Sequence, residues 1–437
     1  MVRLDTEAAR SNIDLSSDDA RFTDAREAHQ TLLDGTGAGS EFLGWRDLLI
    51  DPNDALIEDI AATARQIRRD ADVLLCIGIG GSYLGAKAVI EALTPYLASD
   101  ETPAVDSSAP DDEPTDTEVL FAGHHLSGAY LRQLLDYLDG KSVYVNVISK
   151  SGTTLEPALA FRYVRQWLEE QFDDAYDRII VTTDPSEGAL NKLKDEFGFK
   201  KYVIPRDVGG RFSVLTPVGL LPIATAGIDI RTLFYGAVSE CEALTSADDN
   251  AAIEYAAVRK ALLDEGFSVE VLAHFEPNLA GIGGWWQQLF GESEGKENTG
   301  LYPDVVQYST DLHSLGQYMQ EGQRILAETF LMVENDRGRL PIPSSDHNLD
   351  GLDYLSGRTM SEVTRKAYEG TAQAHAEGGV PVSTISIEQI DAESLGGLIY
   401  FYEHAVAVSG YLLGVNPFDQ SGVEAYKSAM FSLLGRP

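Results

Sequence analysis

The stretch DVLLCIGIGGSYLGAK, residues 72–87, decides the fold class of this chain. A short apolar run of the kind found in buried strands leads into a glycine turn, and a helical pattern follows from about Leu84 to Leu93. Strand, turn and helix in this order are the repeating unit of a parallel sheet. The turn lies between the carboxyl end of the strand and the start of the helix, which is where anion-binding loops occur.

The same unit recurs through the first half of the chain. Strand-like runs precede helical patterns at EVLFAG (118–123), SVYVNVIS (142–149) and RIIVTTD (178–184), and KYVIP (201–205) closes the series. Strands that alternate with helices indicate a parallel sheet covered by helices on both faces.

The second half repeats this theme less clearly, with strand-like runs at FSVEVLAHF (267–275), ETFLMVEN (328–335) and PVSTISI (381–387). The sequence therefore predicts an α/β protein with two domains, each a parallel sheet flanked by helices, and helical arms at both termini. The boundaries that we expect are an N-terminal arm over 1–45, a first domain over 46–205, a second domain over 206–395 and a C-terminal arm over 396–437.

Charge is the most unusual property of the composition. The 437 residues include 33 basic and 69 acidic side chains, which gives a net charge of −36. Such a field repels phosphate backbones and anionic lipids, so we expect neither a nucleic acid nor a membrane as partner. Our hypothesis is adaptation to high salt, where counter-ions screen the self-repulsion. The acidic, proline-bearing stretch 98–117 is expected to be a solvated insertion in the first domain.

Two features bear on the cellular compartment. Cys76 and Cys241 lie far apart in the sequence, so a reducing cytoplasm is the simplest setting, and the N-terminus lacks the apolar core of a secretory signal. The apolar run 395–415 approaches membrane-spanning length, but it contains Glu403 and His404, which favours a buried core helix.

Two turns are candidate anion sites. IGIGGSYLGAK (77–87) lacks the dinucleotide fingerprint because Tyr83 replaces the third glycine, and it departs from the P-loop at Ala86. It fits equally a ligand loop that uses Ser82 or a turn that lets a helix and a strand pack closely. SKSGTT (149–154) offers four hydroxyls at a helix start, and helix capping needs only one of them. The surplus of donors favours a phosphate site there.

Two further motifs contain groups suited to acid–base chemistry. In GGRFSVLTPVGLLPIA (209–224), Arg211 follows two glycines, where a guanidinium could stabilise developing negative charge. A surface arginine in a loop is the more frequent case. GESEGKENTG (291–300) is either one more acidic loop of an acidic protein or the site of a catalytic base.

Two helical patterns near the C-terminus each contain one noteworthy residue. STDLHSLGQYMQEGQ (309–323) predicts a helix with His313 beside its apolar stripe, where it becomes a proton donor only if a partner surface covers it. In NPFDQSGVEAYKSAMFSLLG (416–435), Lys427 lies within the apolar face, which favours a lysine held at a partner or a cleft. The other histidines form no metal-binding pattern, so metal catalysis is not expected.

Taken together, these motifs resemble the phosphoglucose isomerase family in its bacterial form. They run in family order from about Leu74 to Leu434 as IGIGGSYLGAK, ISKSGTTLEP, VGGRFSVLTPVGLLPIA, GESEGK, STDLHSLGQYMQEG and GVNPFDQSGVEAYK. A single motif would fit any domain of the sugar-isomerase (SIS) type, whereas six in order are specific. The acidic insertion and the negative surface charge depart from the family pattern, and neither touches a motif.

The resemblance implies two SIS domains in a homodimer that interconverts glucose 6-phosphate and fructose 6-phosphate in glycolysis and gluconeogenesis, without a metal or cofactor. Glu292 resembles the base that moves a proton between C2 and C1 through a cis-enediol, and Arg211 resembles the arginine that stabilises the enediolate. His313, donated by the neighbouring subunit, and Lys427, on a C-terminal arm that packs back on the active site, resemble the ring-opening residues. The substrate and phosphate positions fall on Gly81, Ser82, Ser149, Lys150, Ser151, Thr153, Thr154 and Gln420.

Two alternatives stay open. A non-catalytic sugar-phosphate sensor of the same domain type would keep SKSGTT and lose the base, the histidine or the lysine, but all three are present here. A related isomerase could also act on mannose 6-phosphate. Within GESEGKENTG, Glu294 and Glu297 are expected to be surface or supporting charges.

Overall fold

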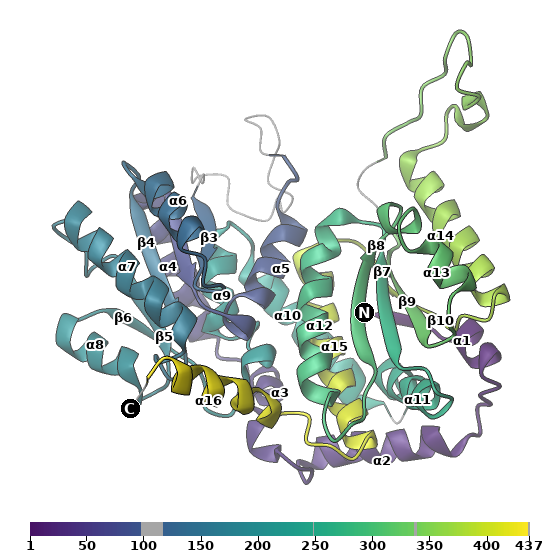
Figure 1. Cartoon of the computed structure of the whole chain (residues 1–437), viewed down its shortest axis with the longest axis horizontal. Coiled ribbons are helices and arrows are strands. Elements are labelled where there is room, and N and C mark those ends of the chain that lie inside the picture. The colour runs from purple at the N-terminus through teal and green to yellow at the C-terminus, as the bar shows by residue number, and fades with distance from the viewer. Residues whose placement is uncertain (98–116, 248, 336–338, 436–437) are drawn as a thin grey trace.

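A computed structural model describes residues 1–97, 117–247, 249–335 and 339–435 of the chain. The two predicted sheets are present, each with five strands and each in its own lobe (Figure 1). The expected insertion at 98–117 lies outside the described residues except for Thr117.

The first sheet has the strand order β3-β2-β4-β5-β6, and all its strand pairs are parallel. The interior strand β2 is buried along its whole length, as expected for a strand covered on both faces. This sheet confirms the strand–helix series predicted from the first half of the sequence. Its strands are β2 (Val73–Ile77), β3 (Glu118–Ala122), β4 (Val143–Ile148), β5 (Ile179–Thr183) and β6 (Lys200–Val203), and the helices around it are α4 (Asp54–Asp70), α5 (Leu84–Leu93), α6 (Gly128–Leu138), α7 (Leu155–Gln171), α8 (Ala189–Phe197) and α9 (Pro217–Thr225).

The second sheet has the strand order β1-β10-β9-β7-β8, with β1 antiparallel to β10 and the other pairs parallel. Three of these strands were predicted, whereas the two edge strands β1 and β8 were missed. The strands are β1 (Arg3–Asp5), β7 (Val269–His274), β8 (Tyr302–Gln307), β9 (Leu326–Val333) and β10 (Val382–Ile387). Because β1 belongs to the second sheet, the N-terminal segment is part of the second lobe and is more than a helical arm.

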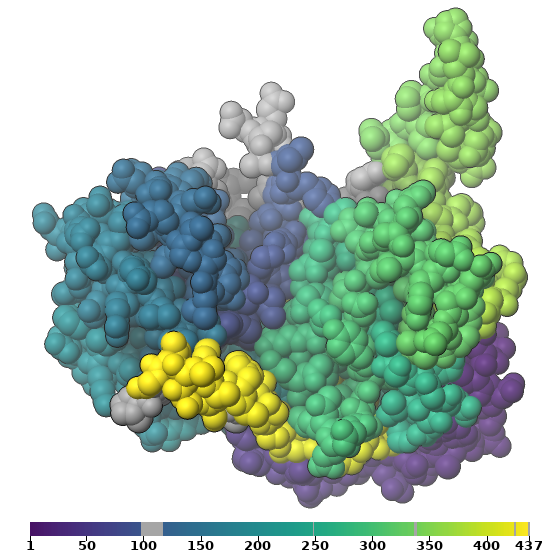
Figure 2. All heavy atoms as spheres, viewed as in Figure 1, coloured from purple at the N-terminus to yellow at the C-terminus, as the bar shows by residue number. Residues whose placement is uncertain are grey.

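The helices beside and between the sheets complete the two lobes. The N-terminal segment contributes α1 (Glu7–Asn12), α2 (Ala20–Asp34) and α3 (Gly44–Ile50). The second lobe contains α10 (Ile230–Ser246), α11 (Ala251–Asp264), α12 (Ala280–Glu294), α13 (Gly316–Glu321), α14 (Met360–Glu377) and α15 (Ala392–Leu412). The last helix, α16 (Glu424–Leu433), crosses from the second lobe to the first and lies across the face between them (Figures 1 and 2). Short 3₁₀ turns occur at η1 (Ser40–Phe42), η2 (Gly80–Ser82), η3 (Gly210–Phe212), η4 (Pro277–Leu279), η5 (Thr310–Leu312), η6 (Asp353–Leu355) and η7 (Ser421–Val423).

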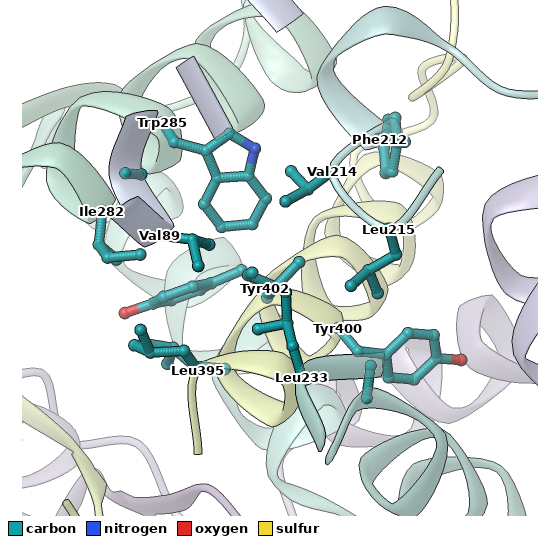
Figure 3. Close-up of a cluster of buried hydrophobic side chains, with 14 of the residues drawn as sticks. Val89, Phe212, Val214, Leu215, Leu233, Ile282, Trp285, Leu395, Tyr400 and Tyr402 are labelled. Carbon is teal, nitrogen blue, oxygen red and sulfur yellow. The ribbon is translucent and has the colours of Figure 1, made fainter. Parts of the chain in front are cut away.

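The apolar run at 395–415 forms most of α15, which is buried from Leu395 to Gly410. This confirms the prediction of a core helix, and no helix in the described ranges is long and apolar enough to cross a membrane. Residue 396, where we expected a C-terminal arm to begin, lies inside this core helix. Tyr402 of α15 packs against Trp285 of α12, with ring centroids 6.4 Å apart (Figure 3). The core around these rings therefore holds α12, the helix that contains Glu292.

The prediction of one helix over 309–323 is wrong, because this segment consists of η5, a turn and the short α13. The carboxylate of Asp311 accepts hydrogen bonds from the Gln307 backbone N–H, at 2.8 Å, and from the Ser314 hydroxyl, at 2.9 Å. Such local side-chain bonds compete with the helical hydrogen-bond pattern and favour a tight turn.

Candidate active site

A cavity of about 370 Å³ lies between the carboxyl ends of the first sheet, α12 and α16. Nine of the twelve predicted site residues line it: Gly81, Ser82, Ser151, Thr153, Thr154, Arg211, Glu292, Gln420 and Lys427. A second cavity of about 520 Å³ shares part of this wall and is lined by Ser149 and Lys150. Among the described residues that line the two cavities, His313 is absent.

Glu292 lies in the last turn of α12, so the first part of GESEGKENTG is helix and not loop. One carboxylate oxygen accepts a hydrogen bond from Gln288 Nε2 at 3.0 Å, and the other is 3.3 Å from Arg211 Nη1. The Glu292 side chain remains 29% exposed, on the cavity side. This carboxylate is therefore fixed by two donors and still open to a ligand.

Arg211 is a buried residue, in contrast to the surface arginine that its motif alone favoured. Its guanidinium donates to Ser293 Oγ at 2.7 Å and to the carbonyls of Pro417 and Asp419 at 2.5 and 3.1 Å. Burial lowers the pKa of Arg211, and the neighbouring Glu292 opposes this effect. Because an arginine stays protonated even when its pKa is lowered somewhat, the cavity wall contains a fixed positive charge.

The glycine turn after β2 lets two loops approach closely. A Cβ atom added at Gly81 would lie only 1.9 Å from the carbonyl oxygen of Gly210, and Ser213 Oγ donates to the Gly81 carbonyl at 3.3 Å. The turn thus serves close backbone packing, and it also lines the cavity through Ser82. Its contact partner is the loop that positions Arg211.

The SKSGTT segment forms the turn between β4 and α7. Ser149 Oγ accepts from the Gly152 N–H at 3.0 Å, and Ser151 Oγ accepts from the Thr153 N–H at 3.2 Å. Thr154 is the N-cap residue of α7, but its side chain makes no capping hydrogen bond. Capping therefore does not account for the hydroxyl of Thr154, a residue that lines the cavity. The positive end of a 17-residue helix points toward the same space.

Lys150 makes contacts that its motif did not predict. Its ammonium donates to the carbonyls of Arg206 and Val208, at 2.8 and 3.5 Å, and it lies 5.8 Å from the ring centroid of Phe42. Burial lowers the pKa of Lys150, and Asp184 opposes this shift. The Lys150 side chain thus binds the loop that leads to Arg211, and Lys150 also lines the second cavity.

Lys427 and His313 lie in different surroundings. Lys427 belongs to α16 and lines the first cavity together with Val423, Tyr426 and Met430, so its apolar helical face covers the opening. His313 is exposed and follows η5 on the second lobe. The structure therefore brings Glu292, Arg211 and Lys427 to one cavity within a single chain, and leaves His313 on the surface.

Gln288, which the sequence analysis missed, and Glu294, which it expected to be a surface or supporting charge, both lie beside the base in α12. Gln288 lies one helical turn before Glu292, a spacing that predicts contact once the helix is known to extend through Glu294. Of the two alternatives expected for Glu294, a surface or a supporting charge, the structure favours the second, because Glu294 is 1% exposed and accepts from Arg259 Nη2 at 2.5 Å. Arg259 also pairs with the buried Glu270, so this charged triad lies beneath the end of α12.

The described residues contain no group of three or more His, Cys, Asp or Glu side chains arranged to hold a metal ion. The fold and the cavity define a two-sheet α/β protein with a polar cavity, containing a buried arginine, at the carboxyl ends of the strands of its first sheet. A sequence profile described as phosphoglucose isomerase matches residues 56–434. The chain belongs to the phosphoglucose isomerase family.

Individual relatives agree with this assignment. The chain is 50% identical over 414 residues to the glucose-6-phosphate isomerase of Staphylococcus epidermidis, covering 94% of this chain and 90% of the relative. It is 49% identical over 440 residues to the glucose-6-phosphate isomerase of Alkaliphilus metalliredigens, covering 100% of this chain and 96% of the relative. A Thermus thermophilus structure described as a hypothetical protein has a TM-score of 0.86 at 28% identity, covering 99% and 100%. A Chlamydia trachomatis glucose-6-phosphate isomerase structure, with a TM-score of 0.77 at 21% identity, covers 99% and 86% and shows the shared fold.

Proposed function

We propose that this protein interconverts glucose 6-phosphate and fructose 6-phosphate, by ring opening followed by proton transfer through a cis-enediol, in glycolysis and gluconeogenesis. The observation that carries the proposal is the pairing of Glu292 with the buried Arg211 at 3.3 Å in the wall of a cavity that also contains Lys427. A carboxylate base next to a fixed cation is what proton abstraction beside a carbonyl requires.

The proposed proton transfer uses Glu292 as the base between C2 and C1. Gln288 and Arg211 each bind one of its oxygens, so the carboxylate is oriented before substrate arrives. When the proton leaves, negative charge develops on the substrate oxygens, and Arg211 is the buried cation beside them. A charge fixed in a poorly hydrated wall stabilises such an oxyanion without reorganisation. The reaction needs no metal or cofactor, because side chains supply the base and the cation.

The proposed phosphate position is the turn before α7. Ser149, Ser151, Thr153 and Thr154 supply hydroxyls there, and the helix N-terminus adds backbone N–H groups. Lys150, within the same turn, contributes positive charge to the second cavity. The same local donors would overcome the repulsion between an anionic substrate and a chain of charge −36. Gly81, Ser82 and Gln420 remain candidate contacts to the sugar.

The proposed ring-opening step uses Lys427 from the same chain and His313 from a neighbouring subunit. The exposed position of His313, outside the cavity of its own chain, supports a homodimer in which the partner covers it. Large exposed apolar side chains lie on the same lobe: Tyr302 is 65%, Leu315 is 43% and Tyr318 is 45% exposed. Such a surface is consistent with a partner subunit.

An NMR time course tests the reaction. The chain, purified from a host without its own isomerase, is mixed with glucose 6-phosphate in molar KCl, and the appearance of fructose 6-phosphate is recorded. We expect conversion to an equilibrium mixture. Binding without conversion would reject the isomerase and favour the sugar-phosphate sensor. A parallel reaction with mannose 6-phosphate shows whether this second substrate is used.

Subunit mixing tests the proposed origin of the histidine. Glu292→Gln and His313→Ala homodimers are mixed, and exchange is verified by mass spectrometry. If each site uses the partner's His313, a heterodimer contains one intact site and activity recovers. If exchange occurs without recovery, each site is built from one chain.

We also propose that the protein is cytoplasmic, on the basis of the free cysteines Cys76 and Cys241. We propose that it is adapted to high salt, on the basis of its net charge of −36. Screening of self-repulsion should raise the melting temperature as KCl increases. Equal stability in dilute buffer would reject this adaptation.

A further inference from the structure

The segment 416–420 joins the core helix α15 to η7 and α16, and two cations hold it in place. Arg211 donates to the carbonyls of Pro417 and Asp419. Lys296 Nζ lies 2.8 Å from Asp419 Oδ1 and also donates to the carbonyl of Asn416. Arg211 lines the cavity beside Glu292, and Lys296 follows the end of α12, the helix that contains Glu292.

Lys296 has no part in the proposed proton transfer, although its side chain is only 13% exposed. It follows α12 directly, one residue after the helix C-cap Gly295. A largely buried ammonium needs compensation. Its direct contacts are one carboxylate and one carbonyl, both in the segment 416–420, and the Glu292 carboxylate adds a weaker electrostatic attraction. The Lys296 side chain therefore connects the helix that contains Glu292 to the segment that contains Gln420.

The helix that follows this segment is weakly packed. None of the described side chains of α16 is buried, and Tyr426 is 57% and Leu433 89% exposed. Burial of apolar area is the main force that fixes a surface helix, so α16 gains little from its own packing. Its position over the cavity depends to a large extent on how its N-terminal connection is held.

We propose that Lys296 is a positioning residue that acts through Asp419 and Asn416 to hold the segment 416–420, and thereby keeps α16 and its Lys427 over the cavity. Because Lys296 and Glu292 lie at the same end of α12, this contact also sets the geometry between the base and Lys427. The expected effect on kinetics rests on the proposed function. The expected effect on the position of α16 rests on the contacts alone.

Hydrogen exchange tests the structural consequence. Lys296→Gln and Asp419→Asn each remove the ion pair, and Asp419→Asn keeps the backbone carbonyl that accepts from Arg211. Asp174→Asn is the matched control, because Asp174 lies 2.7 Å from Arg178, with 52% and 17% exposed side chains, away from the cavity. In the Asp419–Lys296 pair the exposed fractions of the two side chains are similar to those of the control pair, 47% for Asp419 and 13% for Lys296. We expect faster exchange of amides 424–433 in the two test variants and unchanged exchange in the control. Unchanged exchange in all three would overturn the inference.

Kinetics test the positioning role itself. A shift of about 1 Å in a reacting group costs on the order of 100-fold in rate, so Lys296→Gln should lower kcat/KM for glucose 6-phosphate by about 10- to 100-fold. Lys296→Arg should recover most of this loss. In a variant that already contains Lys427→Met, adding Lys296→Gln should lower kcat/KM by less than about threefold, because the effects of coupled sites are not additive.

The two kinetic backgrounds separate positioning from general damage. An equal loss from Lys296→Gln with and without Lys427 would overturn the inference, since a role through Lys427 predicts a much smaller second loss. Failure of the wild-type chain to isomerise would reject the proposed function, and the exchange measurement would still judge whether Lys296 holds α16.

Discussion

Gly81→Ala is the substitution whose effect on the site follows most directly from the structure. The added Cβ would lie 1.9 Å from the Gly210 carbonyl oxygen and 2.7 Å from the Arg211 backbone nitrogen. An ordinary contact needs about 3.4 Å, and the difference between 3.4 and 1.9 Å requires the two loops to separate by about 1.5 Å. Both atoms belong to backbone, so no side chain can rotate away to relieve the clash.

The separation moves Arg211 relative to Glu292. Misplacement by about 1 Å costs on the order of 100-fold in rate, so we expect kcat to fall by about two orders of magnitude. Overpacking of this kind typically costs about 1–3 kcal/mol, which the fold should survive. The assay is conversion of glucose 6-phosphate to fructose 6-phosphate, with the melting temperature measured on the same sample.

Gly284→Ala is the matched control. Gly284 lies inside α12, and nothing lies within 4 Å of a Cβ added there. Alanine in a helix interior is favoured over glycine by about 0.5–1 kcal/mol, so this variant should keep its activity and melt no lower than the parent. A folded Gly81→Ala variant with parental kcat would refute the reasoning, because the two loops would then not define the position of Arg211.

Two further predictions concern stability. Arg259→Met leaves Glu270 and Glu294 buried without their cation, and the free energy of unfolding in urea should fall by about 3–5 kcal/mol. Arg231→Met, which removes an exposed pair with Asp54, should cost at most about 1 kcal/mol, and similar losses for both arginines would contradict the assignment of a buried triad. Burial lowers the pKa of His29, and burial with His29 and Arg46 nearby lowers that of His404 well below its usual value. Their contribution to stability is therefore complete above the unfolded pKa near 6.5 and is lost as pH falls below it, by up to about 1.4 kcal/mol per pH unit for each histidine. Between pH 6.5 and 5, His29→Asn should lose less of its free energy of unfolding, relative to its own value at pH 7.5, than the parent loses. The variant His347→Asn, at an exposed position, should follow the parent. Parallel curves for all three proteins would exclude buried neutral histidines.

The sequence predicted the first sheet almost completely, because its central strands are continuous apolar runs followed by clear helices. The second sheet was harder for physical reasons. Strand β8 contains Pro303 and Asp304, which are rare in strands. The proline is tolerated because β8 is an edge strand that pairs only with β7 in the described sheet. Strand β1 has three residues and is defined by its pairing with β10, which is almost 400 residues away in the sequence.

The candidate site was predicted from motif order, whereas its electrostatics could not be. Arg211 is buried because its partners include the backbone of Pro417 and Asp419, more than 200 residues later. The sequence left Glu294 as either a surface or a supporting charge, because its partner Arg259 lies on another helix, 35 residues earlier. Burial of a charge is decided by partners brought together by tertiary structure, and a local pattern contains no information about them.

The central claim is that Glu292 removes the proton from the sugar. The direct measurement compares kcat and the dissociation constant of glucose 6-phosphate for Glu292→Gln with those of Glu297→Gln, an exposed glutamate of the same motif. We predict that Glu292→Gln folds, binds the sugar phosphate within about threefold of the parent and loses several orders of magnitude in kcat, since the amide cannot accept the proton. Glu297→Gln should retain parental kcat. A folded Glu292→Gln protein with near-parental kcat would contradict the account.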